Sequence, residues 1–178
     1  MQYITNRTQL TSDRLTLVPL SRTQLQLYLE QPHQLEQDLR HPISRDVVTT
    51  RVQRAIRMKL TKMANIHETQ FAWYTYWLLI ITKVPIGVGL AGFKGLPNEQ
   101  GEVEIGYGID PAYHKQGYTT EAVQALIAWA FEEPACQAVV ARDTKKSNVA
   151  SLRVLAKVGM TQYQETEDAF YLRVARDP

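Results

Sequence analysis

The stretch YHKQGYTTEAVQALIAWAF, residues 113–131, joins a polar turn that contains one glycine directly to a helical pattern. Apolar residues fall at i, i+3, i+4 and i+7, namely Val123, Leu126, Ile127 and Ala130. This spacing predicts a helix from about Thr119 that cannot continue beyond Pro134. Because the first N–H groups of a helix lack intrahelical acceptors, residues 116–119 present free donors to an anion, most naturally a phosphate or pyrophosphate.

The glycine of this turn has two interpretations. Gly117 lacks the Cβ that would keep a ligand away from the backbone, and Lys115 adds a positive charge beside it. However, a glycine between a strand and a helix is often only a turn residue. The turn by itself leaves both interpretations open.

The segments before this turn predict a mixture of strands and helices. RLTLVPL, residues 14–20, is typical of a short strand, and a helix is expected from about 21 to 30. A polar connection with two prolines is expected over 31–42, followed by a two-faced helix over 47–66. The apolar face of that helix comprises Val48, Val52, Ala55, Ile56, Met63 and Ile66.

The other face of this expected helix is basic. Arg51, Arg54 and Arg57 point away from the apolar face, which Lys59 interrupts. Solvation is the favoured interpretation of the basic face, and a surface for an acidic substrate is the alternative.

Strands are expected on both sides of the central helix. Three β-type segments separated by turns predict an antiparallel meander over 70–82, 85–95 and 101–110. After the central helix, a strand at 136–142 is followed by a helix from Ser147 or Asn148 to Val158, and Gly159 takes the position after that helix. Two final strands are expected around 160–166 and 169–175. Core positions are favoured for Trp73, Tyr76 and Trp77, with an exposed interface as the alternative.

Composition excludes several classes of protein. The 178 residues, 44% apolar, suit one domain over 1–178, and 20 basic against 18 acidic residues give no strong field for nucleic acid. One cysteine and four scattered histidines indicate neither a disulfide nor a metal site. YWLLII, residues 76–81, is too short to span a bilayer, and MQYITNRTQL, residues 1–10, lacks the apolar core of a secretory signal. We therefore expect a cytoplasmic, metal-free protein that binds neither nucleic acid nor membrane.

A second glycine motif matches a dinucleotide fingerprint. GVGLAG, residues 87–92, reads G-x-G-x-x-G, but that motif binds pyrophosphate only where it opens a helix. The next residues, FKGLPNEQG, contain glycines and a proline that disfavour a helix. We interpret these glycines as strand residues that tolerate a bulge or close backbone approach.

Four segments in order, DRLTLVPL, EIGYGIDPAYHKQGYTTEA, NVASLRVLAKVGM and the terminal strands, resemble the GNAT superfamily of N-acetyltransferases. The resemblance covers nearly the whole chain and is closest to the ribosomal-protein-alanine acetyltransferase (RimJ/RimL-like) branch. It implies an α+β (mixed α/β) acyl-CoA N-acyltransferase fold. A central, mostly antiparallel twisted sheet would be splayed at the coenzyme cleft and flanked by about four helices. The implied cosubstrate is acetyl-CoA, with no metal.

The resemblance also assigns residues to the coenzyme. Tyr107, Gly108 and Ile109 match the strand whose main chain binds the pantetheine arm. The pyrophosphate loop falls on His114, Lys115, Gln116, Gly117, Tyr118 and Thr119. His114 and Thr119 depart from the residue types usual in the family, and Lys115 stands where this branch commonly has glycine.

The chemistry implied is acyl transfer from a thioester to an amine. The amine attacks when neutral, although its ordinary pKa is about 8 for an α-amino group and about 10.4 for a lysine, so a base is needed. Glu104 is the candidate base, directly or through water, and Glu102 is the second candidate; for Glu104 an ordinary ion-paired strand residue is the alternative.

A group must also receive the leaving sulfur of the coenzyme. The family's common tyrosine acid is replaced by Leu155, so Ser151 is the candidate hydrogen-bond donor to the sulfur, with Asn148 positioning the pantetheine or the loop. Ordinary residues at a helix N-terminus, with Asn148 as the cap, are the alternative. Cys136 has no adjacent histidine in the sequence, so direct transfer in a ternary complex is favoured over an acyl-cysteine.

These residues predict an acetyl-CoA-dependent N-acetyltransferase that acts on a protein N-terminal α-amine or a small-molecule amine. The alternatives are an aminoglycoside or polyamine acetyltransferase, or a non-catalytic acyl-CoA-binding sensor of the same fold. The chain is expected to be a monomer or a homodimer.

Overall fold

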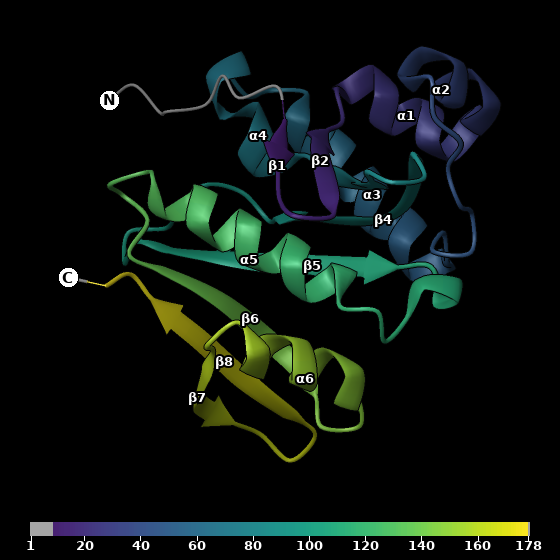
Figure 1. Cartoon of the computed structure of the whole chain (residues 1–178). Helices are drawn as coiled ribbons and strands as arrows, with labels where there is room; N and C mark the ends of the chain where they lie inside the picture. The colour runs from purple at the N-terminus through teal and green to yellow at the C-terminus, as the bar shows by residue number, and fades with distance from the viewer. Residues whose placement is uncertain (1–8, 178) are drawn as a thin grey trace.

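The computed structural model describes residues 9–177, which form one eight-stranded sheet with helices packed on it (Figure 1). The strand order is β1-β2-β3-β4-β5-β6-β8-β7, and every neighbouring pair is antiparallel except β5 and β6. The strands are β1 (Leu10–Thr11), β2 (Leu15–Pro19), β3 (Trp77–Ile81), β4 (Ile86–Phe93), β5 (Glu102–Ile109), β6 (Ala138–Lys145), β7 (Thr161–Glu165) and β8 (Ala169–Ala175). The expected mixed, mostly antiparallel architecture is confirmed.

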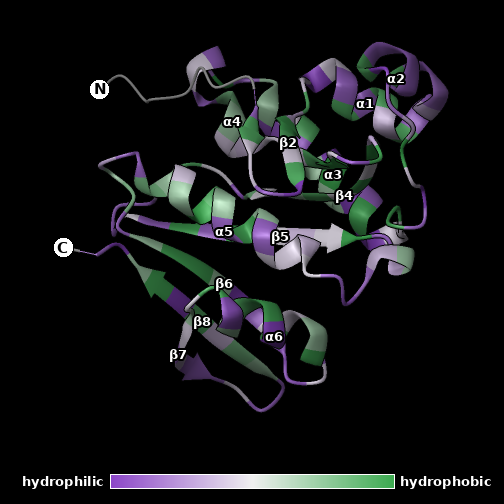
Figure 2. Ribbon diagram, viewed as in Figure 1, coloured by the Kyte–Doolittle hydropathy of each residue, from purple (hydrophilic) through white to green (hydrophobic). Residues whose placement is uncertain are grey.

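Six α-helices lie within residues 9–177, rather than about four. They are α1 (Arg22–Glu30), α2 (Pro32–Leu39), α3 (Thr50–Met63), α4 (Phe71–Tyr74), α5 (Tyr118–Phe131) and α6 (Val149–Lys157). The core comprises two apolar clusters, one including residues of α5 and α6 and the other residues of α1, α2 and α3. Figure 2 shows hydrophobic residues along β6 and α5, whereas many residues of the loops are hydrophilic.

Two predictions from the sequence are wrong. The expected polar connection over 31–42 contains α2, because Pro32 occupies its first turn, where a missing N–H is tolerated. The expected strand over 70–82 begins only at Trp77, because Phe71–Tyr74 forms the short helix α4. The aromatic residues of this segment have strand-like composition, but the buried cluster of Trp73, Trp77, Phe93 and Trp129 decides its conformation.

The glycines of GVGLAG lie within β4, as the sequence predicts. Leu79 pairs with Gly89 and Ile80 with Gly87, so Val88 is an extra residue in a bulge. A Cβ at Gly89 would lie 2.6 Å from the carbonyl oxygen of Gly108. Close backbone approach therefore explains a glycine here without any nucleotide.

No helix within residues 9–177 is both long and apolar enough to cross a membrane. Residues 1–8, on which the expected absence of a secretory signal partly rests, lie outside the described part of the chain.

Lys59 is a buried cation on α3, which was expected only to interrupt an apolar face. The residue is 7% exposed, and its Nζ donates to the carbonyl oxygens of Tyr74 at 3.0 Å and Phe93 at 2.5 Å. The ammonium also lies 4.5 Å from the ring centroid of Tyr76. Burial, with smaller contributions from Lys62 and Lys94, lowers the pKa of Lys59 to about 7.

Replacing Lys59 by methionine should flatten the dependence of stability on pH. Between a folded pKa of about 7 and the ordinary value of 10.5, the unfolded chain binds more protons, so the stability of the native chain rises with pH. We expect a rising melting temperature from pH 7 to about 9.5 in the native chain and little rise in Lys59→Met. Lys62→Met, which removes an exposed ammonium, is the control and should keep the rise. An equal rise in both variants would contradict the prediction.

Candidate active site

The sheet opens between β5 and β6 (Figure 1). Their parallel pairing joins Glu102 to Ala138, Val103 to Val139 and Glu104 to Val140, and it extends no further. Beyond Glu104, β5 runs on to Ile109 paired only with β4. The backbone of Tyr107, Gly108 and Ile109 therefore borders the opening with its hydrogen-bonding groups on the β6 side, where an extended ligand can bind.

The turn after β5 leads from this opening to the N-terminus of α5. The side chain of Asp110 accepts a 2.7 Å hydrogen bond from the N–H of Ala112, and Gly117 is the N-cap of α5 with φ +86°. No side chain caps this N-terminus, so its first N–H groups point outward as donors. The sequence predicts an anion site at this helix N-terminus, which lies at the end of the strand opening.

The loop residues that depart from the family pattern lie in this same turn. Lys115 has φ +61°, a left-handed conformation that glycine adopts more easily, which accounts for the glycine common at this position in the resembling branch. His114, Lys115 and Gln116 are exposed or nearly so, and the His114 Nε2 lies 3.3 Å from the carbonyl oxygen of Ile109. The six predicted loop residues are thus contiguous here: His114 to Gly117 form the turn, and Tyr118 and Thr119 begin α5.

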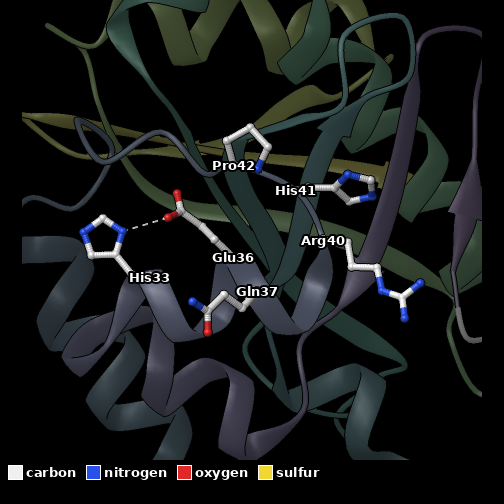
Figure 3. Close-up of a pocket in the computed structure, with 6 residues that line it drawn as sticks. All are labelled: His33, Glu36, Gln37, Arg40, His41 and Pro42. Carbon is white, nitrogen blue, oxygen red and sulfur yellow. Dashed lines mark hydrogen bonds and ion pairs between the residues drawn. The ribbon is translucent and has the colours of Figure 1, made fainter.

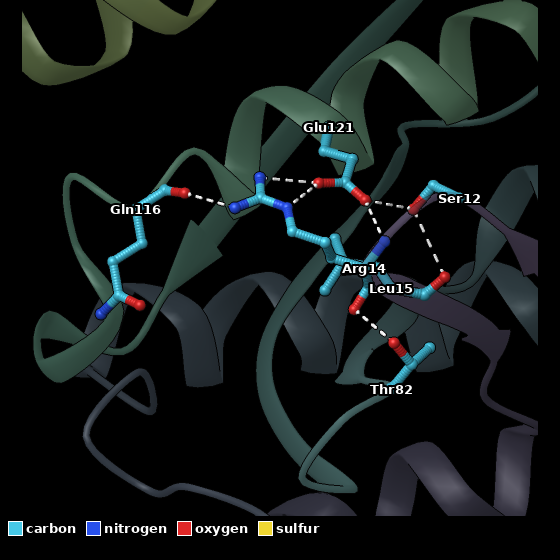
Figure 4. Close-up of polar contacts among 6 residues, drawn as sticks. All are labelled: Ser12, Arg14, Leu15, Thr82, Gln116 and Glu121. Carbon is cyan, nitrogen blue, oxygen red and sulfur yellow. Dashed lines mark hydrogen bonds and ion pairs between the residues drawn. The ribbon is translucent and has the colours of Figure 1, made fainter.

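Arg14 anchors the turn, a role that the sequence alone did not reveal (Figure 4). Its Nη1 donates to the carbonyl oxygen of Gln116 at 2.9 Å, and its Nε donates to Glu121 at 2.7 Å. The backbone N–H of Arg14 and the hydroxyl of Ser12 donate to the other oxygen of Glu121, at 2.7 and 2.8 Å. A Cβ at Gly117 would lie 3.1 Å from the Arg14 Nη2, so this glycine also leaves room for the guanidinium.

Asn148 and Ser151 lie at the N-terminus of α6, and Tyr107 of β5 contacts Ser151. The Asn148 side chain accepts a 3.2 Å hydrogen bond from the N–H of Ser151, as expected of a cap. The Tyr107 hydroxyl lies 2.8 Å from the Ser151 Oγ. Leu155, where the family commonly has tyrosine, is 1% exposed in the apolar core.

Glu104 and Glu102 form ion pairs on β5. Glu104 contacts Lys94 at 2.5 Å and Arg142 at 4.0 Å, and Glu102 contacts Arg142 at 2.6 Å and Arg173 at 3.8 Å. The ion-paired strand residue, which was the alternative interpretation of Glu104, therefore describes its contacts in this structure.

The side chain of Glu104 lies on one face of β5, and the hydroxyls of Tyr107 and Ser151 lie on the other. Side chains alternate along a strand, so Glu104, Gly106 and Gly108 share one face and Tyr107 points to the other. A Cβ at Gly108 would lie 3.4 Å from Val47, in the cluster of α1–α3, whereas Tyr107 packs against the cluster of α5 and α6. A Cβ at Gly106 would have no atom within 4 Å, which leaves open space one step along the strand from Glu104.

A separate hollow lies over α2 and contains none of the predicted site residues (Figure 3). It is lined by His33, Glu36, Gln37, Arg40, His41 and Pro42. The hydrogen bond from the N–H of Ile43 is the main cause that lowers the pKa of Glu36, and Glu36 also contacts Arg45 at 3.2 Å. Among residues 9–177, no group of three or more potential ligands could hold a metal ion.

Replacing Glu121 by glutamine should destabilise the protein at neutral pH more than at acid pH. Burial raises the pKa of Glu121, but hydrogen bonds and charge from Ser12 and Arg14 lower it below 4.5 overall. The carboxylate therefore stabilises the folded state above about pH 4.5, and this contribution is lost as the pH falls through the lowered pKa.

Urea unfolding at pH 7 should give Glu121→Gln about 1–3 kcal/mol less stability than the native chain, with a smaller difference at pH 3. Glu99→Gln, an exposed loop substitution, is the control. A loss that is the same at both pH values would contradict the role assigned to the charge.

The chain is similar to acetyltransferases in sequence and in structure. The profile described as Acetyltransferase (GNAT) domain matches residues 14–161. "Uncharacterized N-acetyltransferase YjdG" of Bacillus subtilis (strain 168) is 38% identical over 72 residues, 40% of this chain and 42% of that protein. This match and that to YnaD of the same organism each span less than half of the relative's length.

Solved structures show the same fold over almost the whole chain. The ribosomal-protein-S5-alanine acetyltransferase of Vibrio fischeri has a TM-score of 0.65 at 15% identity, covering 96% of this chain and 98% of that one. RimL, a ribosomal L7/L12 alpha-N-protein acetyltransferase in complex with coenzyme A, has a TM-score of 0.65 at 18% identity, covering 94% and 97%. With the profile match over residues 14–161, the strand opening and the helix turn, the chain belongs to the GNAT acetyltransferase family.

Proposed function

We propose that this protein is a cytoplasmic N-acetyltransferase, a monomer or homodimer, that transfers the acetyl group of acetyl-CoA to a primary amine in a ternary complex. The opening beside β5, which leads to the uncapped N-terminus of α5, carries the proposal. Acetyl-CoA would supply the thioester as cosubstrate, and no metal is needed for this chemistry.

The coenzyme would bind along the opening and the turn. The main chain of Tyr107 to Ile109 would hold the pantetheine arm, as a strand holds an extended partner. The free N–H groups at the start of α5 and the exposed Lys115 would hold the pyrophosphate. Gly117 supports this fit, because its missing Cβ keeps the backbone accessible and glycine adopts its positive φ without strain.

Glu104 would accept the proton of the attacking amine, directly or through water. Its side chain contacts Lys94 at 2.5 Å, and the open space at Gly106 leaves room for the amine beside it. Ser151 would donate a hydrogen bond to the sulfur that leaves. Because Glu104 lies on one face of β5 and Ser151 packs toward the other, the amine and the coenzyme would approach from opposite sides.

The acceptor is proposed to be a protein N-terminal α-amine or a small-molecule amine. An α-amine has an ordinary pKa of about 8, so more of it is neutral than of a lysine at neutral pH. The cations Arg51, Arg54 and Arg57 on α3 disfavour an aminoglycoside or polyamine by charge repulsion, should α3 border the acceptor. A non-catalytic acyl-CoA sensor is the second candidate, favoured by the buried Leu155 in place of the usual tyrosine.

Calorimetric titration with acetyl-CoA should show binding, and NADH should show none. Desulfo-CoA should bind as well, because it keeps both the pantetheine arm and the pyrophosphate, whereas NADH has a pyrophosphate but no pantetheine arm. Gly117→Ala should weaken binding about tenfold, because the new Cβ is disfavoured at φ +86° and approaches Arg14.

Gly159→Ala is the matched control, because Gly159 also has a positive φ, +81°, but lies outside the loop. A Cβ added at Gly159 would meet no atom within 4 Å. This variant should share the loss of stability and keep the affinity for acetyl-CoA. If acetyl-CoA fails to bind the native chain at millimolar concentration, the proposed function is wrong.

Thiol release from acetyl-CoA in the presence of peptide N-termini and small amines should distinguish an enzyme from a sensor. An enzyme releases free coenzyme A only when an accepted amine is present, whereas a sensor binds without release. With acetyl-CoA and an accepted amine, Glu104→Gln should lower kcat/KM by about 10² or more, as expected of a general base. A greater loss of kcat/KM in Glu102→Gln than in Glu104→Gln would instead assign the role of general base to Glu102.

A further inference from the structure

The hydrogen-bonded hydroxyls of Tyr107 and Ser151 join β5 to the first turn of α6, beside the opening between β5 and β6. The two oxygens are 2.8 Å apart, and the Tyr107 oxygen is 3.3 Å from the carbonyl oxygen of Ser151. The shorter contact is the stronger one, so the phenol bonds chiefly to the side chain of Ser151. The pair joins the strand that would hold the pantetheine arm to the residue that would face the sulfur.

A serine hydroxyl has a single proton, so its other contacts decide where that proton points. If Tyr107 donates to the Ser151 Oγ, the serine proton stays free for another acceptor. Without that donor, a serine in a helix commonly turns its proton to the carbonyl three or four residues earlier. The direction of the Tyr107 hydrogen bond therefore decides whether Ser151 can serve as a donor.

We propose that Tyr107 is a positioning residue that donates to Ser151 and thereby directs the Ser151 proton to the departing coenzyme sulfur. This inference rests on the proposed function and extends it. Ser151 alone would be a weak donor to a developing thiolate. A second hydroxyl that donates to it polarises the Ser151 O–H and strengthens its hydrogen bond to the sulfur.

The step balances without a proton from the pair. The amine nitrogen forms a bond to the acetyl carbon, the carbon–sulfur bond breaks, and the sulfur leaves with the electron pair as a thiolate. The proton of the amine goes to the base, proposed to be Glu104. The thiolate is stabilised by the Ser151 hydroxyl, and Ser151 and Tyr107 both keep their protons.

The surroundings of the pair suit this role. Burial raises the pKa of Tyr107, although its hydrogen bond with Ser151 acts against the rise, so the phenol stays protonated at neutral pH. Ser151 lies in the first turn of α6, where the N–H groups and helix dipole favour a negative charge. Leu155 has no proton to donate, so the stabilisation that the family draws from its tyrosine must come from elsewhere at this site.

The thiol pKa of bound coenzyme A tests the hydrogen-bond chain without turnover. A free thiol has an ordinary pKa of about 8.5, and donors facing the sulfur should lower it in the complex. Thiolate absorbance is followed from about pH 6 to 9.5, where Cys136 stays silent because burial raises its pKa to about 11. We expect a lowered thiol pKa in the native chain, a partial return toward the free value in Tyr107→Phe, and a full return in Ser151→Ala.

The kinetic test is a double-mutant cycle with an accepted amine. Tyr107→Phe should lower kcat about tenfold, with the KM for acetyl-CoA changed less than about twofold, since it weakens the Ser151 hydrogen bond that forms chiefly as the sulfur leaves. Because Tyr107 acts through Ser151, the double variant should be no slower than Ser151→Ala. Tyr74→Phe, which removes a hydroxyl outside the site, is the matched control and should be unchanged.

Two results would overturn the inference. One is a Tyr107→Phe loss that adds in full to that of Ser151→Ala, and the other is a bound thiol pKa that Tyr107→Phe leaves unchanged. Failure of the proposed function is distinct from both, because it appears in the native chain as absent coenzyme binding or absent amine-dependent thiol release.

Discussion

The candidate site depends on the point where the parallel pairing of β5 with β6 ends, at Glu104 and Val140. A parallel pair requires a crossover connection, which here is α5 with the turn before it. The helix must therefore start where β5 ends, beside the opening that the lost pairing creates. The crossover connection thus places the unpaired backbone of β5 next to the free N–H groups of α5. An extended anionic ligand needs both.

The side chain of Arg14, which directly precedes β2, holds the turn before α5 in shape. Arg14 bonds the Gln116 carbonyl and the Glu121 carboxylate, while its guanidinium lies 4.8 Å from the ring centroid of Tyr118. The guanidinium thus neutralises Glu121, which would otherwise oppose an anion at this helix terminus. The first-turn N–H groups remain available, because the carboxylate accepts from Ser12 and Arg14 instead.

Periodicity and turn chemistry predicted α5, the loop, the cap of α6 and the glycines of β4, because these features depend on neighbouring residues. The helical start of the aromatic segment at Phe71 was missed, since tertiary packing overrode composition there. The helix α2 was missed because a proline is tolerated in the first turn of a helix. The contacts of Arg14 with Glu121 and of Tyr107 with Ser151 join distant positions, so no local pattern could reveal them. The burial of Lys59 was missed because two backbone carbonyls, rather than a carboxylate, receive its ammonium, and backbone groups leave no mark in the sequence.

The Arg14 anchor also bears on the order in which the chain folds. Its hydrogen bonds with Glu121 join residues separated by 107 positions, and that of Ser12 joins residues separated by 109. Closing so long a loop is entropically unfavourable until intervening strands have paired. During synthesis, β2 can pair with β3 only after β3 has left the ribosome. Arg14 can bond Glu121 only after the first turn of α5 has followed. The anion-binding turn should therefore take its final shape late, after the part of the sheet that carries it has formed.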